Sequence, residues 1–504
     1  MNRSLKICDF PHSFVLLTTT LLSFVVLFFI SPDSPTHDFH DRCDSANFFM
    51  CGKAWMNGLI PYVDFTDSKG PLLWLIYGIG YLLSPRSYVG VFFLSVIAYS
   101  ITYFYTYRIA MLFLVSRRMA LLLAVLMTLV YFCPLYHYET RAEDFCLPFV
   151  MISLYYTCLF LYNDNAVNDA LIRDISFAIG LCMGATLLIK YTVTAMIGSF
   201  VVYLFITLFH KQKQLRTCFI WITVGGLSVI LPFVVLFILM GNFYAFIDQY
   251  FFITFITVRE IQSSRGGMLH DICLIVMQNA PVLLLFIVSA ITFLFFANIK
   301  KHLYFPIVST INFILICIPN ARWAYYFSIV SPFVLFSLIP LFKLFESNKF
   351  FLHMRLFISI MSITILSVIM ANYHYYYYSI YSVGLTNLKF QKDNTTRKVY
   401  KSYSDIIAQC PHQPRIIYID GQCNSEYGVS AEALPGCRDW SQQNGATFHM
   451  KESAWEAIKL HKADFVIANL PESITKLQKL GYKPIDSSAP KLFVLSDSFK
   501  KHNE

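Results

Sequence analysis

Long apolar runs recur along most of the chain and predict a bundle of membrane-spanning helices. A helix needs about 20 apolar residues to cross a bilayer, and about 11 runs approach that length with few charged residues inside them. We therefore predict a polytopic α-helical membrane protein. The runs cover residues 14–31, 88–107, 119–135, 146–162, 174–189, 191–209, 218–240, 281–298, 303–319, 324–342 and 354–376.

The first run is a possible cleaved signal peptide, because basic residues precede it and it lies at the short end of spanning length. No A-x-A cleavage site follows residue 30. We therefore predict a retained signal-anchor helix whose N-terminus faces the inside.

Residues 71–83 (PLLWLIYGIGYLL) are apolar but too few to span easily, and their treatment fixes the orientation of every later helix. If this segment crossed, the basic clusters at 117–118, 210–216 and 300–301 would face outside, against the positive-inside rule. We therefore predict a juxtamembrane helix that does not cross. The long polar loops, including 32–87, and the C-terminus then face outside.

The pattern changes after Tyr378, and residues 385–504 have an ordinary polar composition. Apolar β-rich segments at 415–420, 464–470 and 491–496 predict strands. Helical patterns at 398–409, 451–461 and 472–480 alternate with them. We predict a transmembrane domain over 1–384 and a small extracytoplasmic α/β domain over 385–504. No glycine-rich nucleotide motif follows any of these strands.

The composition indicates a membrane protein and argues against a nucleic-acid partner. The chain is 57% hydrophobic and 14% charged, whereas soluble domains average about 25% charged residues. The net charge of +9 comes from short basic clusters between apolar runs, as topology signals do. We therefore predict no nucleic-acid partner.

Candidate chemistry is concentrated in the first polar loop, Asp38–Pro71, which is longer than a simple connector and mixes acids, lysines and aromatic residues. Asp44 is a possible general base near the membrane surface. It is also suited to cap a helix that begins in Asp44-Ser45-Ala46. The two roles are compatible, and from the residues alone we favour the cap. Lys69 is either a phosphate-binding cation or an interfacial lysine.

This loop resembles the first outer loop of the GT-C superfamily of membrane glycosyltransferases. That superfamily uses polyprenyl-phosphate-linked sugars and includes protein O-mannosyltransferases and the lipid A aminoarabinose transferase. The resemblance covers the loop motifs and, in overall organisation, residues 14–376. The motif residues are Asp44-Ser45-Ala46, Gly52, Gly58, Pro61-Tyr62-Val63-Asp64 and Asp67-Ser68-Lys69-Gly70-Pro71.

The resemblance implies roles for the first-loop residues. Asp44 matches the acid that deprotonates the acceptor hydroxyl, and Lys69 matches a basic residue that meets the donor phosphate. Asp64 and Asp67 are expected beside the substrate.

The second outer loop, 137–145, resembles the acidic second loop of the family. It implies that Glu143 or Asp144 is the second acid, with Arg141 beside the substrate. The competing interpretation is that these acids cap the following helix and interact with its dipole.

Two further basic positions are expected at the site. Lys190 lies between two short apolar runs, where a lysine is costly, and it either binds the donor phosphate or caps carbonyls at the hairpin tip. Arg322 and Tyr325 lie in a motif where relatives often show His-Tyr; here Tyr325-Tyr326 stands in its place, which removes the histidine.

We expect no cofactor and no metal, because the chain has no HxxxH or CxxC motif. The resemblance implies the same, since GT-C members that use monosaccharide-phosphate donors commonly need no metal. Cys410, Cys423 and Cys437 lie in the predicted outer region, where disulfides are possible but the pairing is open.

The predicted function is an inverting glycosyltransferase in a bacterial inner or plasma membrane. Its partners would be a polyprenyl-phosphate-linked sugar and an acceptor that is a glycan, a lipid or a protein. A lipid-sugar flippase would instead show internal repeats and charges at mid-span. A polysaccharide polymerase of another fold would also place its site outside, and a non-catalytic scaffold could be built on the same fold.

Overall fold

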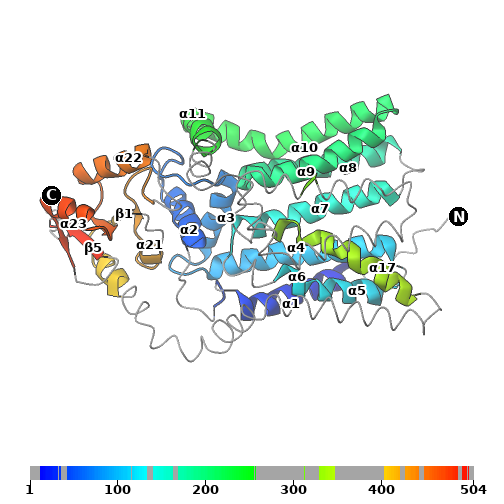
Figure 1. Cartoon of the computed structure of the whole chain (residues 1–504), viewed down its shortest axis with the longest axis horizontal. Coiled ribbons are helices and arrows are strands. Elements are labelled where there is room, and N and C mark those ends of the chain that lie inside the picture. Colours follow the sequence, from blue (N-terminus) through cyan, green and yellow to red (C-terminus); the bar gives the residue numbers. More distant parts are fainter. Residues whose placement is uncertain are drawn as a thin grey trace.

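The computed structural model describes a helical bundle and a smaller sheet-containing part at one end of it (Figure 1). The structure describes residues 12–31, 33–35, 43–114, 116–132, 140–162, 168–254, 256, 311–312, 328–346, 402–420, 426–441, 448–485, 491–496 and 498.

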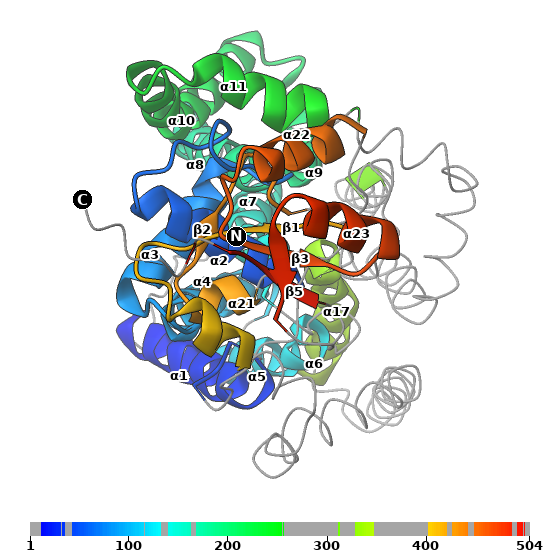
Figure 2. The same cartoon turned by 90° about the vertical axis from the view of Figure 1, so that its left-hand side faces the viewer.

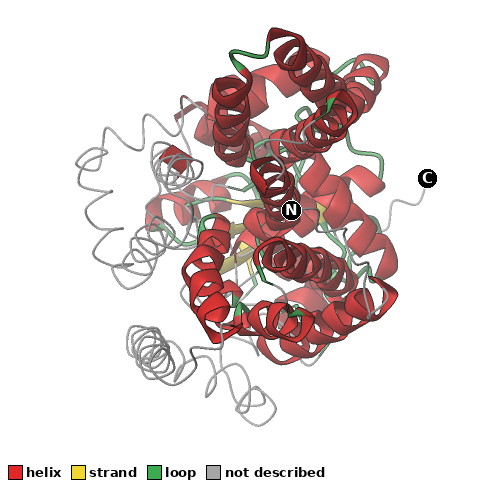
Figure 3. Ribbon diagram, turned by 90° about the vertical axis from the view of Figure 1, so that its right-hand side faces the viewer, coloured by secondary structure: helices red, strands yellow, loops and turns green. Residues whose placement is uncertain are grey.

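The bundle is built from the predicted apolar runs. Five of its helices are long and apolar enough to cross a membrane. They are α4 (Val89–Phe113), α7 (Ala142–Tyr162), α8 (Asp169–Ile189), α9 (Tyr191–Leu208) and α10 (Gln212–Leu239). The apolar helix α1 (His12–Ile30) packs against α4. Figure 3, seen along the bundle, shows helices throughout it and the strands behind them.

The predicted span 119–135 forms two helices, α5 (Arg117–Leu126) and α6 (Thr128–Tyr131). The interruption is local, because the Met127 N–H still donates to the Leu123 carbonyl at 3.0 Å. Ser116 caps α5 by accepting from the Met119 N–H. The predicted spans 281–298, 303–319 and 354–376 lie almost entirely outside the described residues, so the count of about 11 helices stays a prediction.

Four shorter elements follow α10 along the chain. The helix α11 (Phe243–Ile247) leads into a π-helical turn, η1 (Asp248–Ile253), and the 3-10 helix η3 (Ser331–Val334) leads into α17 (Leu335–Glu346). Tyr250 of η1 is buried, and its hydroxyl donates to the Leu187 carbonyl in α8 at 2.7 Å. This contact ties the chain after α10 to the tip of the α8–α9 hairpin.

Two short helices lie between the bundle and the sheet (Figure 1). They are α2 (Cys43–Met56) and α3 (Pro71–Leu83), which pack on each other, with Phe48 edge-on to Tyr77 at 5.6 Å. The bounds of α3 are those predicted for the juxtamembrane helix. At 1.5 Å per residue α3 is about 20 Å long, shorter than the ~30 Å hydrocarbon core.

The C-terminal sheet has five strands in the order β2-β1-β3-β5-β4. β1 pairs in parallel with β2 and β3, whereas β5 is antiparallel to β3 and β4. The three predicted strands and the predicted helices at 451–461 and 472–480 are confirmed, and the predicted helix 398–409 is confirmed over 402–407. β2, β4 and α21 were not predicted. The strands are β1 (Arg415–Tyr418), β2 (Leu434–Pro435), β3 (Phe465–Ala468), β4 (Tyr482–Pro484) and β5 (Lys491–Leu495), and the helices are α21 (Glu426–Ser430), α22 (Phe448–Lys459) and α23 (Pro471–Lys479).

The two faces of the sheet bury different partners, because successive strand residues point to opposite faces. Ile416 and Tyr418 belong to the same buried cluster as the bundle and α2. Ile417 and Val466 belong to a second cluster that includes residues of α22 and α23. Figure 2 shows the sheet from its outer side, with α22 and α23 over it. The sheet is therefore joined to the membrane part through an apolar core.

A buried lysine lies in this junction. Lys53 of α2 is 1% exposed, and its ammonium donates to the Gly428 carbonyl of α21 at 2.8 Å and to the Val429 carbonyl at 3.5 Å. Burial lowers the pKa of Lys53 to about 7; the charge of Glu432 opposes this shift and that of Arg86 adds to it. Holding a buried ammonium by backbone carbonyls is a costly way to join two segments.

Candidate active site

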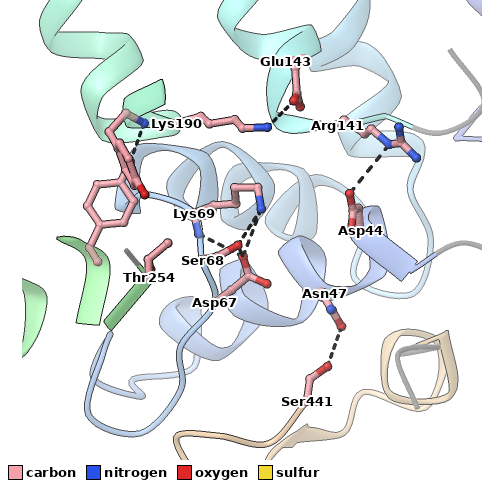
Figure 4. Close-up of polar contacts among 12 residues, drawn as sticks. Asp44, Asn47, Asp67, Ser68, Lys69, Arg141, Glu143, Lys190, Thr254 and Ser441 are labelled. Carbon is pink, nitrogen blue, oxygen red and sulfur yellow. Dashed lines mark hydrogen bonds and ion pairs between the residues drawn. The ribbon is translucent and has the colours of Figure 1, made fainter. Parts of the chain in front are cut away.

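The predicted first-loop base lies in the first turn of α2 and faces the second loop. The Asp44 carboxylate is 3.8 Å from the Arg141 Nε, and their side chains are 16% and 4% exposed (Figure 4). A carboxylate is favoured in the first turn of a helix by the helix dipole. Because α2 begins at Cys43, Asp44 lies inside the first turn and is not the N-cap that the residues alone favoured. Its ion pair directs the carboxylate at the second loop.

The second loop separates the two acids that the sequence left equivalent. Asp144 is the third residue of α7, and its Oδ2 accepts from the Arg141 N–H at 2.7 Å, which is the return bond of a capping box. Its Oδ1 accepts from the Tyr99 hydroxyl at 2.5 Å. Both carboxylate oxygens of Asp144 thus hold the start of α7 in place.

Glu143 has a different partner. Its carboxylate accepts from the Lys190 ammonium, and the two side chains are 3% and 7% exposed. Lys190 lies at the break between α8 and α9, where its backbone is extended, with φ −155° and ψ 100°. The break places a lysine at the tip of a helical hairpin rather than along a helix, and the ion pair joins that tip to α7.

The Asp67–Gly70 turn presents the third cation. The Asp67 carboxylate accepts from the Lys69 N–H at 3.0 Å, and the Lys69 ammonium donates to the Ser68 hydroxyl at 2.7 Å. The same ammonium is 4.0 Å from the Asp67 carboxylate and 5.4 Å from the centre of the Phe48 ring. Burial raises the pKa of Asp67, and the charge of Asp44 adds to this, while Lys69 opposes it. Asp67 is therefore close enough to be affected by the charge of Asp44.

Gly70 explains how this turn reaches the α8–α9 hairpin. The Gly70 N–H donates to the Ile189 carbonyl at 3.0 Å, and a Cβ at Gly70 would overlap the Leu188 carbonyl oxygen. Only glycine fits so close to another backbone. The first loop and the Lys190 tip are thus held together by main-chain contact.

Asp64 has a local role in the structure, because its Oδ2 accepts from the Ile60 N–H at 2.7 Å. This bond closes the turn in which Tyr62 has a φ of 63°. Asp64 therefore shapes the first loop through a local hydrogen bond. The predicted site residues Arg322 and Tyr325 lie outside the described residues.

The C-terminal part contributes contacts that sequence reasoning missed. The Arg438 carbonyl accepts from the Thr66 N–H at 3.0 Å. Ser441 donates to the Asn47 side chain, one turn along α2 from Asp44, at 3.4 Å. Figure 4 shows the loop segment that carries Ser441 below α2. No motif marked these residues, because their proximity depends on how the sheet docks on α2.

The arrangement brings four carboxylates and three cations to one end of the bundle. The second loop joins two ion pairs, Asp44–Arg141 and Glu143–Lys190. Lys69 belongs to the first loop. Such a set can accept a proton at one point and hold a phosphate at another. In the described part of the chain, no cluster with metal-ligand geometry occurs among these residues; one occurs on the C-terminal sheet.

Known structures share this architecture over nearly the whole chain. The ArnT of Cupriavidus metallidurans in the apo state matches with a TM-score of 0.59 at 13% identity, covering 96% of this chain and 97% of that one. This protein has the GT-C fold. The resemblance expected from the first loop is confirmed at the level of the fold. Together with five described helices that are long and apolar enough to cross a membrane, this fold indicates a multi-pass membrane protein.

Other comparisons agree with the GT-C assignment. ArnT from the same organism, bound to undecaprenyl phosphate, matches with a TM-score of 0.57 at 12% identity, covering 96% and 97% of the two chains. The oligosaccharyltransferase of Archaeoglobus fulgidus, in complex with Zn and sulfate, matches with a TM-score of 0.54 at 15% identity, covering 96% of this chain and 73% of that one.

The sequence profile of the family described as dolichyl-phosphate-mannose-protein mannosyltransferase matches residues 68–238 of this chain. The matched segment runs from the Lys69 turn to the end of α10 and includes Arg141, Glu143 and Lys190. No curated protein matches the sequence.

Proposed function

We propose that this protein is an inverting glycosyltransferase that transfers a sugar from a polyprenyl-phosphate donor to an acceptor hydroxyl on the outer face of the membrane. The observation that carries the proposal is the meeting of the Asp44–Arg141 pair with Lys69 and Lys190 at one end of a GT-C bundle. The ArnT relative was solved with undecaprenyl phosphate, a lipid of the class that a spent donor would leave.

In the proposed reaction, Asp44 accepts the proton of the acceptor hydroxyl as its oxygen attacks the anomeric carbon. The bond from that carbon to the phosphate oxygen breaks, and polyprenyl phosphate leaves with the electron pair. Attack opposite the leaving group inverts the anomeric centre. Arg141 positions the base through its ion pair at 3.8 Å.

The leaving phosphate gains negative charge as the bond breaks, so cations that face it accelerate the reaction. Lys69 is the better candidate for this task, because its ion pair with Asp67 is long, at 4.0 Å, and its side chain is 15% exposed. Lys190 is more deeply buried and in direct contact with Glu143. We assign Glu143 to the second acid, which positions Lys190, and Asp144 to the framework of the site.

The outer-face location rests on the charge pattern. The site end of the bundle carries the mixed loops, whereas the opposite end carries the basic 210–216 cluster, where Lys213 pairs with Asp169 at 3.0 Å. Basic residues gather on the inner side of membrane proteins. The C-terminal sheet, which contacts α2, would then also lie outside and face the acceptor.

The test is transfer of radiolabelled sugar from polyprenyl-phosphate donors in membranes that contain the wild type or Asp44→Asn. The substitution keeps the shape of the side chain and removes the base, so we expect a loss of at least roughly 100-fold. Asp174→Asn is the control, because that carboxylate is 62% exposed on α8 and pairs with the neighbouring Arg173, away from the site.

Equal transfer by the wild type and Asp44→Asn would exclude Asp44 as the base. Absence of transfer by the wild type with every donor, at normal protein level, would favour a flippase or a scaffold. Loss in both variants would indicate a general effect of charge removal rather than a catalytic role.

A further inference from the structure

Three side chains of the C-terminal sheet have the chemistry of metal ligands and come together at one edge. Cys410 follows the helical segment 402–407, His412 precedes β1, and Asp464 precedes β3. Their ligand atoms all lie within 4.8 Å of one another. The cluster takes no part in the reaction proposed above, and its thiol, imidazole and carboxylate come from three different segments.

We propose that Cys410, His412 and Asp464 form a zinc-binding site with one position open to water. Thiolate, imidazole and carboxylate are the usual protein ligands of zinc, and three of them with a solvent position form a recognised tetrahedral arrangement.

The distances fit one shared ion. The Cys410 sulfur is 3.6 Å from the His412 Nε2, close to the roughly 3.5 Å that tetrahedral geometry gives for a zinc with ordinary Zn–S and Zn–N bonds. The same Nε2 is 2.8 Å from the Asp464 Oδ1. The sulfur is almost as close to the His412 Nδ1, at 3.7 Å, so the ring would turn to direct Nε2 at an ion shared with the sulfur and the carboxylate. Because the His412 side chain is 42% exposed, its ring has room to widen the second distance.

The protein fixes Asp464 so that one oxygen remains directed at the cluster. Its Oδ2 accepts from the Arg415 N–H at 2.8 Å, and the Asp464 N–H donates to the Arg415 carbonyl at 2.9 Å. The carboxylate is thus oriented by the β1–β3 pairing, and Oδ1 is the oxygen that meets His412. Hydrogen-bonded carboxylates of this kind are typical of metal sites, where the outer contact orients the ligand.

A Cys410 thiolate and the Asp464 carboxylate would place two negative charges at this point. A divalent cation would neutralise them on binding, with the sulfur bound as thiolate.

The ion would join the segment that enters the C-terminal part to its central strands. Cys410 is also close to the Ser498 carbonyl, at 3.6 Å, so a fourth segment lies beside the same point. Zinc would therefore tie together segments that otherwise meet through a few hydrogen bonds. The expected consequence is a more heat-resistant sheet when zinc is present.

The test uses the full-length protein in detergent, without a polyhistidine tag, treated with a chelator and a phosphine reductant. Titration with Co²⁺ should give one equivalent of thiolate-to-cobalt absorption, which Zn²⁺ then removes. Cys410→Ser should abolish this absorption, and His412→Ala should weaken binding at least roughly tenfold. Cys437→Ser is the matched control, because Cys437 is another partly buried free thiol of the same sheet.

Zinc should also raise the melting temperature of the wild type and of Cys437→Ser but not of His412→Ala, whose exposed side chain is the least disruptive to remove. Absence of thiolate absorption in the wild type, or its persistence in Cys410→Ser, would overturn the proposal. Alkylation of Cys410 at neutral pH that is faster than that of Cys437 and unaffected by zinc would overturn it in favour of a reactive thiol.

Discussion

Replacing Lys53 by methionine should stabilise the junction between α2 and the C-terminal sheet at neutral pH. Methionine keeps the length and apolar stem of the side chain but removes the buried ammonium. The change also removes donors to the Gly428 and Val429 carbonyls, at 2.8 and 3.5 Å. Losing these bonds costs about 1–3 kcal/mol if the carbonyls find no other donor.

Removing the buried charge should stabilise the fold by more than the loss of these two hydrogen bonds destabilises it. Lys53 has a pKa of about 7 in the folded chain against 10.5 as the ordinary value, and each unit corresponds to about 1.4 kcal/mol. Between these values the unfolded chain binds more protons than the folded one, so stability rises with pH. The charge therefore costs the fold about 4 kcal/mol at pH 7 and about 2 kcal/mol at pH 9, and below pH 7 the cost levels off.

The assay is denaturant unfolding in detergent, followed by tryptophan fluorescence from pH 6 to pH 9. Relative to Lys53→Met, the wild type should gain about 2 kcal/mol between pH 7 and pH 9 and little between pH 6 and pH 7. Lys459→Met is the control, because that lysine is exposed on α22 and should show no such gain. A parallel pH dependence of the wild type and Lys53→Met would refute the assignment of the buried charge to Lys53.

Two further substitutions test the framework of the site. Glu143→Gln deprives the Lys190 ammonium of this counter-ion and should lower the free energy of unfolding by roughly 3–5 kcal/mol. Adding Lys190→Met should restore most of that free energy. Additive losses in a double-mutant cycle would contradict the pairing. Gly70→Ala forces a methyl group against the Leu188 carbonyl and should cost about 1–3 kcal/mol and much of the transfer activity. Gly198→Ala, where a methyl group meets nothing within 4 Å, should be neutral or stabilising; equal effects of the two on thermal unfolding would show that the close approach is unimportant.

Much of the fold could be predicted because the physics behind it is local. Apolar runs set the bundle helices, and the short length of 71–83 with the positive-inside rule predicted a separate helix, which is α3. The strands around Ile416, Val466 and Phe493 were recognisable from short β-rich runs. β2 was missed because two residues carry no periodic pattern.

The site could be predicted only in part, because partner choice is a long-range property. The sequence placed Glu143 and Asp144 side by side and could not say that one caps α7 while the other pairs with Lys190. It gave no sign that Ser441 would reach Asn47, 394 residues earlier. The Cys410–His412–Asp464 cluster escaped motif reasoning because its members are 2 and 52 residues apart.

The bond from Lys53 to Gly428 spans 375 positions of the chain, and this has a consequence for biogenesis. During synthesis, α2 leaves the ribosome long before the segment on which it docks. The first-loop side of the site therefore lacks one of its supports until more than four-fifths of the polypeptide has been made. A ribosome-bound or prematurely terminated chain would hold its membrane helices and Asp44 without this docking contact. We expect transfer activity to arise late in synthesis, after the C-terminal sheet has folded against α2.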